Sequence, residues 1–268
     1  MFFKNLDSDL RAALLIQLRD LWTHTSTAIE GNSLTLGETA FVLREGLTVA
    51  GKPLKDHQEV VGHARAIDLL WGCLEPGKAF GENELFALHK AVQTEAIYDY
   101  YQPVGKWKNE PNSTAGIVNG RQILFEYALP AHVPALMERW FVLLHELEDK
   151  TQAGDAKQTL NAYVQLHVAF VRIHPFADGN GRLARLVANL PVLRAGLPPI
   201  IIPKEQRKEY IDILAAWHYA AGQIKAGDEL LDATEELAVF AEFCQRAWQE
   251  SIRLVEEARR RQEIRRTL

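Results

Sequence analysis

Apolar residues recur every three or four positions along most of the chain, the spacing that gathers them on one face of an α-helix. Glycine and proline residues interrupt these runs and mark the expected helix ends. The pattern predicts an all-α fold, a helical bundle of one or two domains. The predicted helices cover residues 6–29, 35–46, 56–71, 82–95, 133–147, 160–174, 180–190 and 204–221, and a last helix runs from 232 through 252 into a basic end.

One segment breaks the helical spacing and favours strands. Ile117 and Val118 form one short apolar run, and residues 122–125 form another. Asn119-Gly120 between them is a pair that two-residue hairpin turns prefer. The segment therefore predicts a β-hairpin, for which a surface ribbon without a task is the simplest explanation.

The stretch HPFADGNGRLAR, residues 174–185, lies between two of the predicted helices. Pro175 ends the first helix near His174, and the second begins near Asn180. Gly179 and Gly181 leave backbone N–H groups unobstructed at its start. Because free N–H groups and the helix dipole favour negative charge, this turn is a candidate phosphate site.

The side chains around this turn add to that chemistry. Arg182 and Arg185 lie on one side of the helix and can reach the same polyphosphate. Asp178 offers the hard oxygen ligand that Mg²⁺ prefers, and His174 suits proton transfer near neutral pH. Together they indicate phosphoryl or nucleotidyl transfer, although each residue taken singly is as easily a helix cap or a solvated charge.

The stretch resembles the signature of the Fic family, His-x-Phe-x-(Asp/Glu)-Gly-Asn-Gly-Arg-x-x-Arg, at every fixed position. The resemblance implies a Fic fold whose β-hairpin flap lies beside the active site, and transfer of AMP from ATP to a Ser, Thr or Tyr hydroxyl of a protein. It implies that His174 deprotonates the hydroxyl and that Asp178 holds Mg²⁺. The nucleotide-binding residues that it implies are Gly179, Asn180, Gly181, Arg182, Leu183, Arg185 and Tyr210.

Residues 26–32, STAIEGN, resemble the inhibitory motif (Ser/Thr)-x-x-x-Glu-(Gly/Asn) that precedes the core in one class of Fic proteins. The resemblance implies that Glu30, with Ser26, pairs with Arg185 and blocks the ATP γ-phosphate. A carboxylate and a phosphate compete for the same guanidinium donors. If the pair contributes ~3 kcal/mol, its loss would strengthen binding of ATP in the productive position roughly a hundredfold. Taken alone, Glu30 is an ordinary surface charge near a helix end.

The resemblance also assigns roles outside the signature. It implies that Ile123, Leu124 and Phe125 of the flap dock a target segment by main-chain pairing. Tyr210 stands where relatives place a tyrosine near adenine, although a core-edge tyrosine is nearly as good an explanation. Eight residues on, His218 replaces a common asparagine, which leaves the nucleotide base open with ATP favoured.

Relatives often carry an arginine near Lys106 and Lys108, so the resemblance assigns these lysines no clear role. His57 and His63 have no ligand-like partners in the sequence, and both are expected to be structural. His167 lies seven residues before His174 on a similar face, but a core position explains it better than a metal pair.

Composition narrows the class of protein. The chain is 47% hydrophobic and 24% charged, as an ordinary globular protein is. A net charge of −5 argues against nucleic acid as the main partner. With no signal sequence and no long apolar run, the chain is expected to be cytoplasmic, without a membrane partner. Its two cysteines, Cys73 and Cys244, are expected to be buried free thiols.

We expect an N-terminal helical region with the inhibitory helix over residues 1–75, a Fic catalytic core over 76–225, and a C-terminal helix with a basic end over 226–268. The expected activity is autoinhibited protein adenylylation, with ATP and Mg²⁺, of a target that the sequence does not identify; the chain itself is one candidate. The alternatives are removal of AMP from a protein, transfer of another nucleotide or phosphate group, and a non-catalytic nucleotide sensor. Relatives often form dimers, so a homodimer is also expected.

Overall fold

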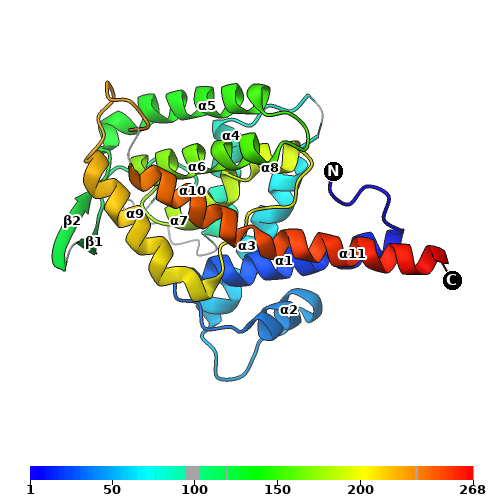
Figure 1. Cartoon of the computed structure of the whole chain (residues 1–268). Coiled ribbons are helices and arrows are strands. Elements are labelled where there is room, and N and C mark those ends of the chain that lie inside the picture. Colours follow the sequence, from blue (N-terminus) through cyan, green and yellow to red (C-terminus); the bar gives the residue numbers. More distant parts are fainter. Residues whose placement is uncertain (76, 94–102, 119, 233–234, 268) are drawn as a thin grey trace.

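The computed structural model describes residues 1–75, 77–93, 103–118, 120–232 and 235–267. The described residues form α-helices and one small antiparallel hairpin, as the sequence predicts (Figure 1). The helices are α1 Ser8–Ile29, α2 Leu36–Glu45, α3 Leu54–Gly72, α4 Glu82–Val92, α5 Val133–Lys150, α6 Ala156–Ile173, α7 Asn180–Val187, α8 Leu190–Arg194, α9 Arg207–Ala221, α10 Glu235–Ala247 and α11 Gln249–Thr267, with short 3-10 turns at Pro130–His132 and Lys204–Gln206.

Helix α6 lies at the centre of the bundle. Its N-terminus is capped by Asp155, whose carboxylate accepts a hydrogen bond from the Gln158 backbone N–H at 2.9 Å. Its first residues, 156–158, are exposed, but from Ala162 onward most of its side chains are buried, and α5, α7, α8 and α10 pack around it (Figure 1). A helix covered on most sides has to place largely apolar residues there. This packing fixes the direction in which α6 delivers the residues that follow it.

The N-terminal helices pack against the same core. Thr35 and Glu38 form the capping box that the sequence predicts for α2, and Gly46 ends that helix with φ of +67°. Helix α1 packs on α2, α3 and α11, and its last turn contacts α7. The end of α1 therefore lies beside the loop that carries the signature residues.

The C-terminal helix differs from the prediction in two ways. The helix expected over 232–252 is divided into α10 and α11 at Trp248, whose indole N–H donates to the buried Pro198 carbonyl at 2.8 Å. Because glutamates are interspersed among its arginines, the sequence favours a solvated helix face or a linker for the basic end, but this end pairs with the start of the chain. Arg265 contacts the Asp9 carboxylate at 2.9 and 2.7 Å, and Gln262 accepts from the Asp7 backbone N–H at 2.7 Å.

The hairpin consists of β1 Ser113–Val118 and β2 Arg121–Glu126, in a register that pairs Val118 with Arg121. It packs against α9 at one end of the bundle (Figure 1). Gly116 is required there, because a Cβ at this position would lie 2.7 Å from the Phe125 ring. The predicted turn residue Asn119 lies outside the described residues.

Other expectations for single residues were wrong. Asp56 stands at the predicted start of the helix over 56–71, where an aspartate is a typical cap, but α3 begins at Leu54 and the Asp56 carboxylate accepts from the Ser33 backbone N–H at 2.8 Å. Val61 fits the apolar spacing of that helix, which predicts a core position, but it is 49% exposed. Helix α4 ends at Val92, and the last residues of the helix predicted to reach 95 lie outside the described part.

The three-part division of the chain stays a prediction. One hydrophobic cluster contains residues from α1, α3, α6, α9 and α11, so the packing itself draws no boundary at the expected positions. Across the described residues, no helix combines the length and the apolar character needed to cross a membrane.

Asn189 is the buried polar group that joins α7 to the extended segment before α9. Its side chain accepts from the Ile200 N–H at 2.7 Å and donates to the Ile200 and Arg185 carbonyls at 3.0 and 2.9 Å. Asn189→Ala leaves these groups unpaired and is expected to lower the free energy of unfolding by about 2–4 kcal/mol. Urea denaturation measures this, with the exposed Asn161→Ala as control; an equal, small effect of both changes contradicts the prediction.

Candidate active site

The loop between α6 and α7 positions the signature residues. His174 ends α6 in the left-handed region with φ of 53°, and its N–H still donates to the Phe170 carbonyl at 2.9 Å. Asn180 then closes the loop on itself, since its side chain accepts from the Phe176 N–H at 2.9 Å and donates to the Phe176 carbonyl at 2.8 Å. The loop is therefore rigid, and both amide atoms of Asn180 are already used.

A cavity of about 390 Å³ opens on this loop. His174, Asp178 and the start of α7 line one side of it. The hairpin lines another side with Thr114 and Phe125, and α9 lines a third. A cavity of this size accommodates a nucleotide-sized ligand.

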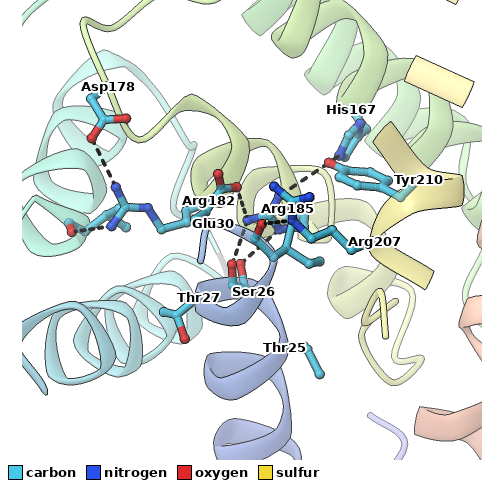
Figure 2. Close-up of polar contacts among 12 residues, drawn as sticks. Thr25, Ser26, Thr27, Glu30, His167, Asp178, Arg182, Arg185, Arg207 and Tyr210 are labelled. Atoms are coloured by element: carbon cyan, nitrogen blue, oxygen red, sulfur yellow. Dashed lines mark hydrogen bonds and ion pairs between the residues drawn. The ribbon is translucent and has the colours of Figure 1, made fainter. Parts of the chain in front are cut away.

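Glu30 of α1 reaches into this cavity and pairs with Arg185 of α7. The carboxylate Oε1 lies 2.7 Å from a terminal nitrogen of the guanidinium (Figure 2). Ser26 receives two further hydrogen bonds from Arg185, at 3.0 Å to its Oγ and 2.9 Å to its carbonyl. The Arg185 side chain is only 3% exposed, whereas that of Glu30 is 39% exposed. The arginine is thus a buried cation whose carboxylate partner stands at the solvent edge.

The same carboxylate occupies the N-terminal end of α7. A Cβ built on Gly181 would lie 2.6 Å from Glu30 Oε1, so the carboxylate lies directly against the glycine backbone. Burial by itself would lower the pKa of Arg185, but Glu30 and Tyr210 outweigh it and raise that pKa above its usual value. The helix N-terminus and Arg185 therefore form an anion site that Glu30 fills.

Arg182 and Asp178 lie on the other side of the loop. Arg182 donates to the Asp178 carboxylate at 3.4 Å and to the Val92 carbonyl at 3.3 Å, while its buried Nε has no acceptor among the described residues (Figure 2). Partial desolvation at the loop would raise the pKa of Asp178, but a hydrogen bond from Gln93 and the charge of Arg182 lower it. Asp178 is therefore an ionised, largely exposed carboxylate at the mouth of the cavity.

This donor set fits Mg²⁺ held together with a polyphosphate. No group of three His, Cys, Asp or Glu side chains able to hold a metal occurs within the ranges that the structure covers. Mg²⁺ usually takes one or two carboxylates and completes its shell with phosphate oxygens and water. One exposed carboxylate beside an arginine whose Nε lacks an acceptor among the described residues meets that requirement.

His174 is poised to accept a proton. Its Nδ1 lies 3.2 Å from the Val171 carbonyl, and because a carbonyl only accepts, Nδ1 carries the hydrogen and Nε2 has the free lone pair. Tyr127 stacks on the imidazole with 3.7 Å between ring centroids and 9° between planes. Burial, with a further contribution from Lys108, lowers the pKa of His174 to about 3. The imidazole is therefore neutral near physiological pH.

Known proteins resemble the chain in sequence and in structure. Residues 79–192 match the profile of the Fic/DOC family. The chain belongs to the Fic/DOC family. It is 32% identical over 193 residues to protein adenylyltransferase fic-1 of Caenorhabditis elegans. The aligned region covers 71% of this chain and 35% of the relative. The chain is 30% identical over 193 residues to protein adenylyltransferase Fic of Drosophila willistoni. Here the aligned region covers 70% of this chain and 35% of the relative.

The fold agrees with that membership. A Fic domain containing signaling protein from Bacteroides thetaiotaomicron superposes with a TM-score of 0.78 at 27% identity, covering 95% of this chain and 93% of that one. Fic-1 from C. elegans, residues 134–508, superposes with a TM-score of 0.73 at 25% identity, covering 96% of this chain and 68% of that one. The chain spans about a third of the length of the curated relatives it matches, 35% in each case above.

The Fic site also contains a residue that the sequence did not point to. His89 of α4 accepts from the Gly105 N–H at 2.8 Å through Nδ1, so its Nε2 carries the hydrogen that donates to the Asp178 carbonyl at 3.2 Å. Its ring stacks on Phe176 at 3.9 Å, and burial lowers the pKa of His89 to about 4. His89 thus stabilises the signature loop through its hydrogen bond to Asp178 and its stacking on Phe176. No motif marks it, because its partners lie far away in the sequence.

Tyr210 and His218 both line the cavity from α9. Tyr210 is 1% exposed; its hydroxyl lies 3.0 Å from His167 Nε2 and accepts from Arg185 at 3.4 Å (Figure 2). His218 donates through Nε2 to the Glu126 carbonyl at 3.2 Å and lies edge-on to Phe125. Both residues therefore line the cavity and also connect α9 to Arg185 and to the hairpin.

Some residues of the predicted site lie elsewhere. The Leu183 side chain is fully buried and its N–H donates to the Gly179 carbonyl at 3.0 Å, so it has no free group for a nucleotide. Phe125 lines the cavity, but Leu124 is 63% exposed on the outer face of the hairpin. Ile123 is half-buried and pairs with Gly116 across the hairpin. The docking roles of these three hairpin residues stay predictions.

His63 of α3 is influenced by Arg182 and Arg185 of α7, and it makes the stability of the fold depend on pH. It is fully buried, and neither ring nitrogen has a hydrogen-bond partner among the described residues. Burial, then Arg185 and Arg182, lower its pKa well below the usual value. Its folded pKa is below that of the unfolded chain, so the unfolded state binds the proton first as pH falls below about 6.5.

We therefore expect the free energy of unfolding to decrease as the pH is lowered from about 7.5 to about 5.5. His63→Leu should make that decrease smaller by about 1 kcal/mol. The unfolding free energy from urea titrations at both values measures it, and an unchanged pH dependence in His63→Leu contradicts the assignment.

Proposed function

We propose that this protein transfers AMP from ATP to a hydroxyl group of a protein, and that Glu30 restrains the reaction by occupying the phosphate site. The contact between Glu30, Arg185 and the Gly181 backbone carries the proposal. In this contact a carboxylate of the chain itself lies against the N-terminal end of α7, where negative charge is favoured. The names of the curated relatives, protein adenylyltransferases, support the activity.

His174 is the proposed base. With Nδ1 hydrogen-bonded to Val171, its Nε2 is free to take the proton of a target hydroxyl placed in the cavity. The hydroxyl oxygen then attacks the α-phosphorus of ATP, the bond to the β-phosphate oxygen breaks, and pyrophosphate leaves with its electron pair. Arg182 and Arg185 would hold the phosphates in line for that displacement. No covalent enzyme intermediate is needed.

Asp178 would bind the Mg²⁺ that accompanies ATP. When bound, the ion neutralises charge that develops on the phosphates. The Nε of Arg182 lacks an acceptor among the described residues, and a phosphate oxygen would supply one. The hairpin beside the cavity would hold the target segment by main-chain pairing.

Release from Glu30 is the proposed control. When Glu30 moves away, Arg185 keeps its bonds to Ser26 but loses its anion, and a terminal phosphate can take the same place. Because the Glu30 carboxylate is 39% exposed, solvent weakens the pair well below a buried one, to about 1–2 kcal/mol. That energy corresponds to about a tenfold change in the affinity for ATP bound in the productive position. A cytoplasmic location and a homodimer stay predictions.

We expect Glu30→Gly to raise labelling of protein by α-phosphate-labelled ATP at least about tenfold, because it frees Arg185 for the phosphate. Glu30→Gly/His174→Ala should abolish that labelling. The assay uses the purified protein with Mg²⁺ and a host lysate, and the labelled band identifies the target. Glu45→Gly, a change of an exposed glutamate at the end of α2, is the matched control and should behave like the wild type.

Lower activity in Glu30→Gly would contradict inhibition by this residue. If Glu30→Gly instead loses the ability to release AMP from an already modified protein, the reaction is hydrolysis with Glu30 orienting water. Absence of label in every variant, with ATP still bound, identifies a nucleotide sensor or another donor.

A further inference from the structure

Lys108 is a buried lysine behind the signature loop to which no role has been given. It lies in the segment before β1 and is 3% exposed. Its backbone N–H donates to the Pro175 carbonyl at 2.9 Å, directly after His174. Its ammonium donates to Asn112 Oδ1 at 2.6 Å. A buried ammonium is costly, so its retention in this place calls for a function.

Asn112 passes this contact on to the loop. Because its Oδ1 accepts from Lys108, its amide nitrogen faces the other way and donates to the Phe176 carbonyl at 2.9 Å. The same carbonyl accepts from Asn180 at 2.8 Å. The segment before β1 thus donates hydrogen bonds to two successive carbonyls after His174, those of Pro175 and Phe176. These bonds add to the ones that Asn180 forms within the loop.

The charge of Lys108 also acts on His174. The titratable groups that influence the imidazole are Lys108 from the segment before β1, His218 from α9 and Asp178 from the loop, and the Tyr127 ring covers one face. Lys108 has the largest influence of these charges and opposes protonation of His174. Burial lowers the pKa of Lys108 itself to about 7, so the lysine is charged at the acidic pH where His174 would take up a proton.

We propose that Lys108 is a positioning residue for the transfer reaction: its hydrogen bonds to Asn112 and Pro175 fix the loop that carries His174, and it places a buried cation behind that loop. The inference rests on the proposed function, because it assigns His174 the task of base. It adds that a cation outside the signature opposes protonation of that base, in addition to the larger effect of burial. The two effects are separable, since one depends on hydrogen bonding and the other on charge.

Three substitutions separate them in the Glu30→Gly background. Lys108→Arg keeps the charge and the donor, Lys108→Gln keeps a donor without the charge, and Lys108→Met removes both. We expect the acid limb of kcat/KM to move to higher pH by about one unit in the Gln and Met variants and to stay in place in the Arg variant. Asn112→Ala, which keeps the charge, should lower kcat about tenfold with the acid limb unmoved.

The titration of the His174 imidazole by NMR, assigned by comparison with His174→Gln, is the second readout and requires no activity. It should show the same upward shift in the Gln and Met variants, and circular dichroism checks their folding. If Lys108→Met does not fold, the Gln and Arg pair still decides the charge effect. An unshifted His174 midpoint in Lys108→Gln overturns the proposal, and so does a wild-type kcat in Asn112→Ala. If no variant transfers AMP while the midpoint still shifts, the proposed function fails and the electrostatic role of Lys108 stands.

Discussion

A buried guanidinium has to be paired with an anion, and in this protein Arg185 makes that requirement the organising constraint of the site. Its side chain is 3% exposed and donates to Ser26, Glu30 and Tyr210, three residues from two other helices. Removing the anion without a replacement would leave an uncompensated charge inside the protein. In the function that we propose, either of two occupants, the Glu30 carboxylate or a phosphate, would meet this requirement. This choice connects the regulation that we propose to the fold.

His174, the proposed base, depends on a second constraint, the rigidity of the loop after it. The carbonyls of Pro175, Phe176 and Asp178 accept hydrogen bonds from Lys108, from Asn112 and from His89, which come from outside the signature. A base works only when its lone pair points at the proton, so these contacts matter as much as the imidazole itself. Short signatures describe the groups that face the ligand and leave out the groups that hold them.

The sequence predicted the elements whose causes are local. The capping box at Thr35, the helix end at His174 and the pairing of the hairpin strands follow from residues a few positions apart. The contact of Glu30 with Arg185 spans 155 residues, and only the resemblance to the Fic family pointed to it.

The sequence did not predict features that depend on distant partners. Where α10 and α11 are divided, the Trp248 indole bonds to Pro198, which lies 50 residues away, and Val61 is exposed although it fits the apolar spacing of α3. The stacking of Tyr127 on His174 and the grip of His89 on the loop have the same character. Periodicity shows which face is apolar but not which neighbour covers it.

Calorimetric binding of ATP and of AMP to the wild type and to Glu30→Gly tests the central claim most directly. AMP lacks the terminal phosphates, so only ATP should compete with the carboxylate for Arg185. The account predicts that Glu30→Gly tightens ATP binding about tenfold and leaves AMP binding unchanged. Equal ATP affinity in the two proteins, or an equal gain for AMP, would contradict it.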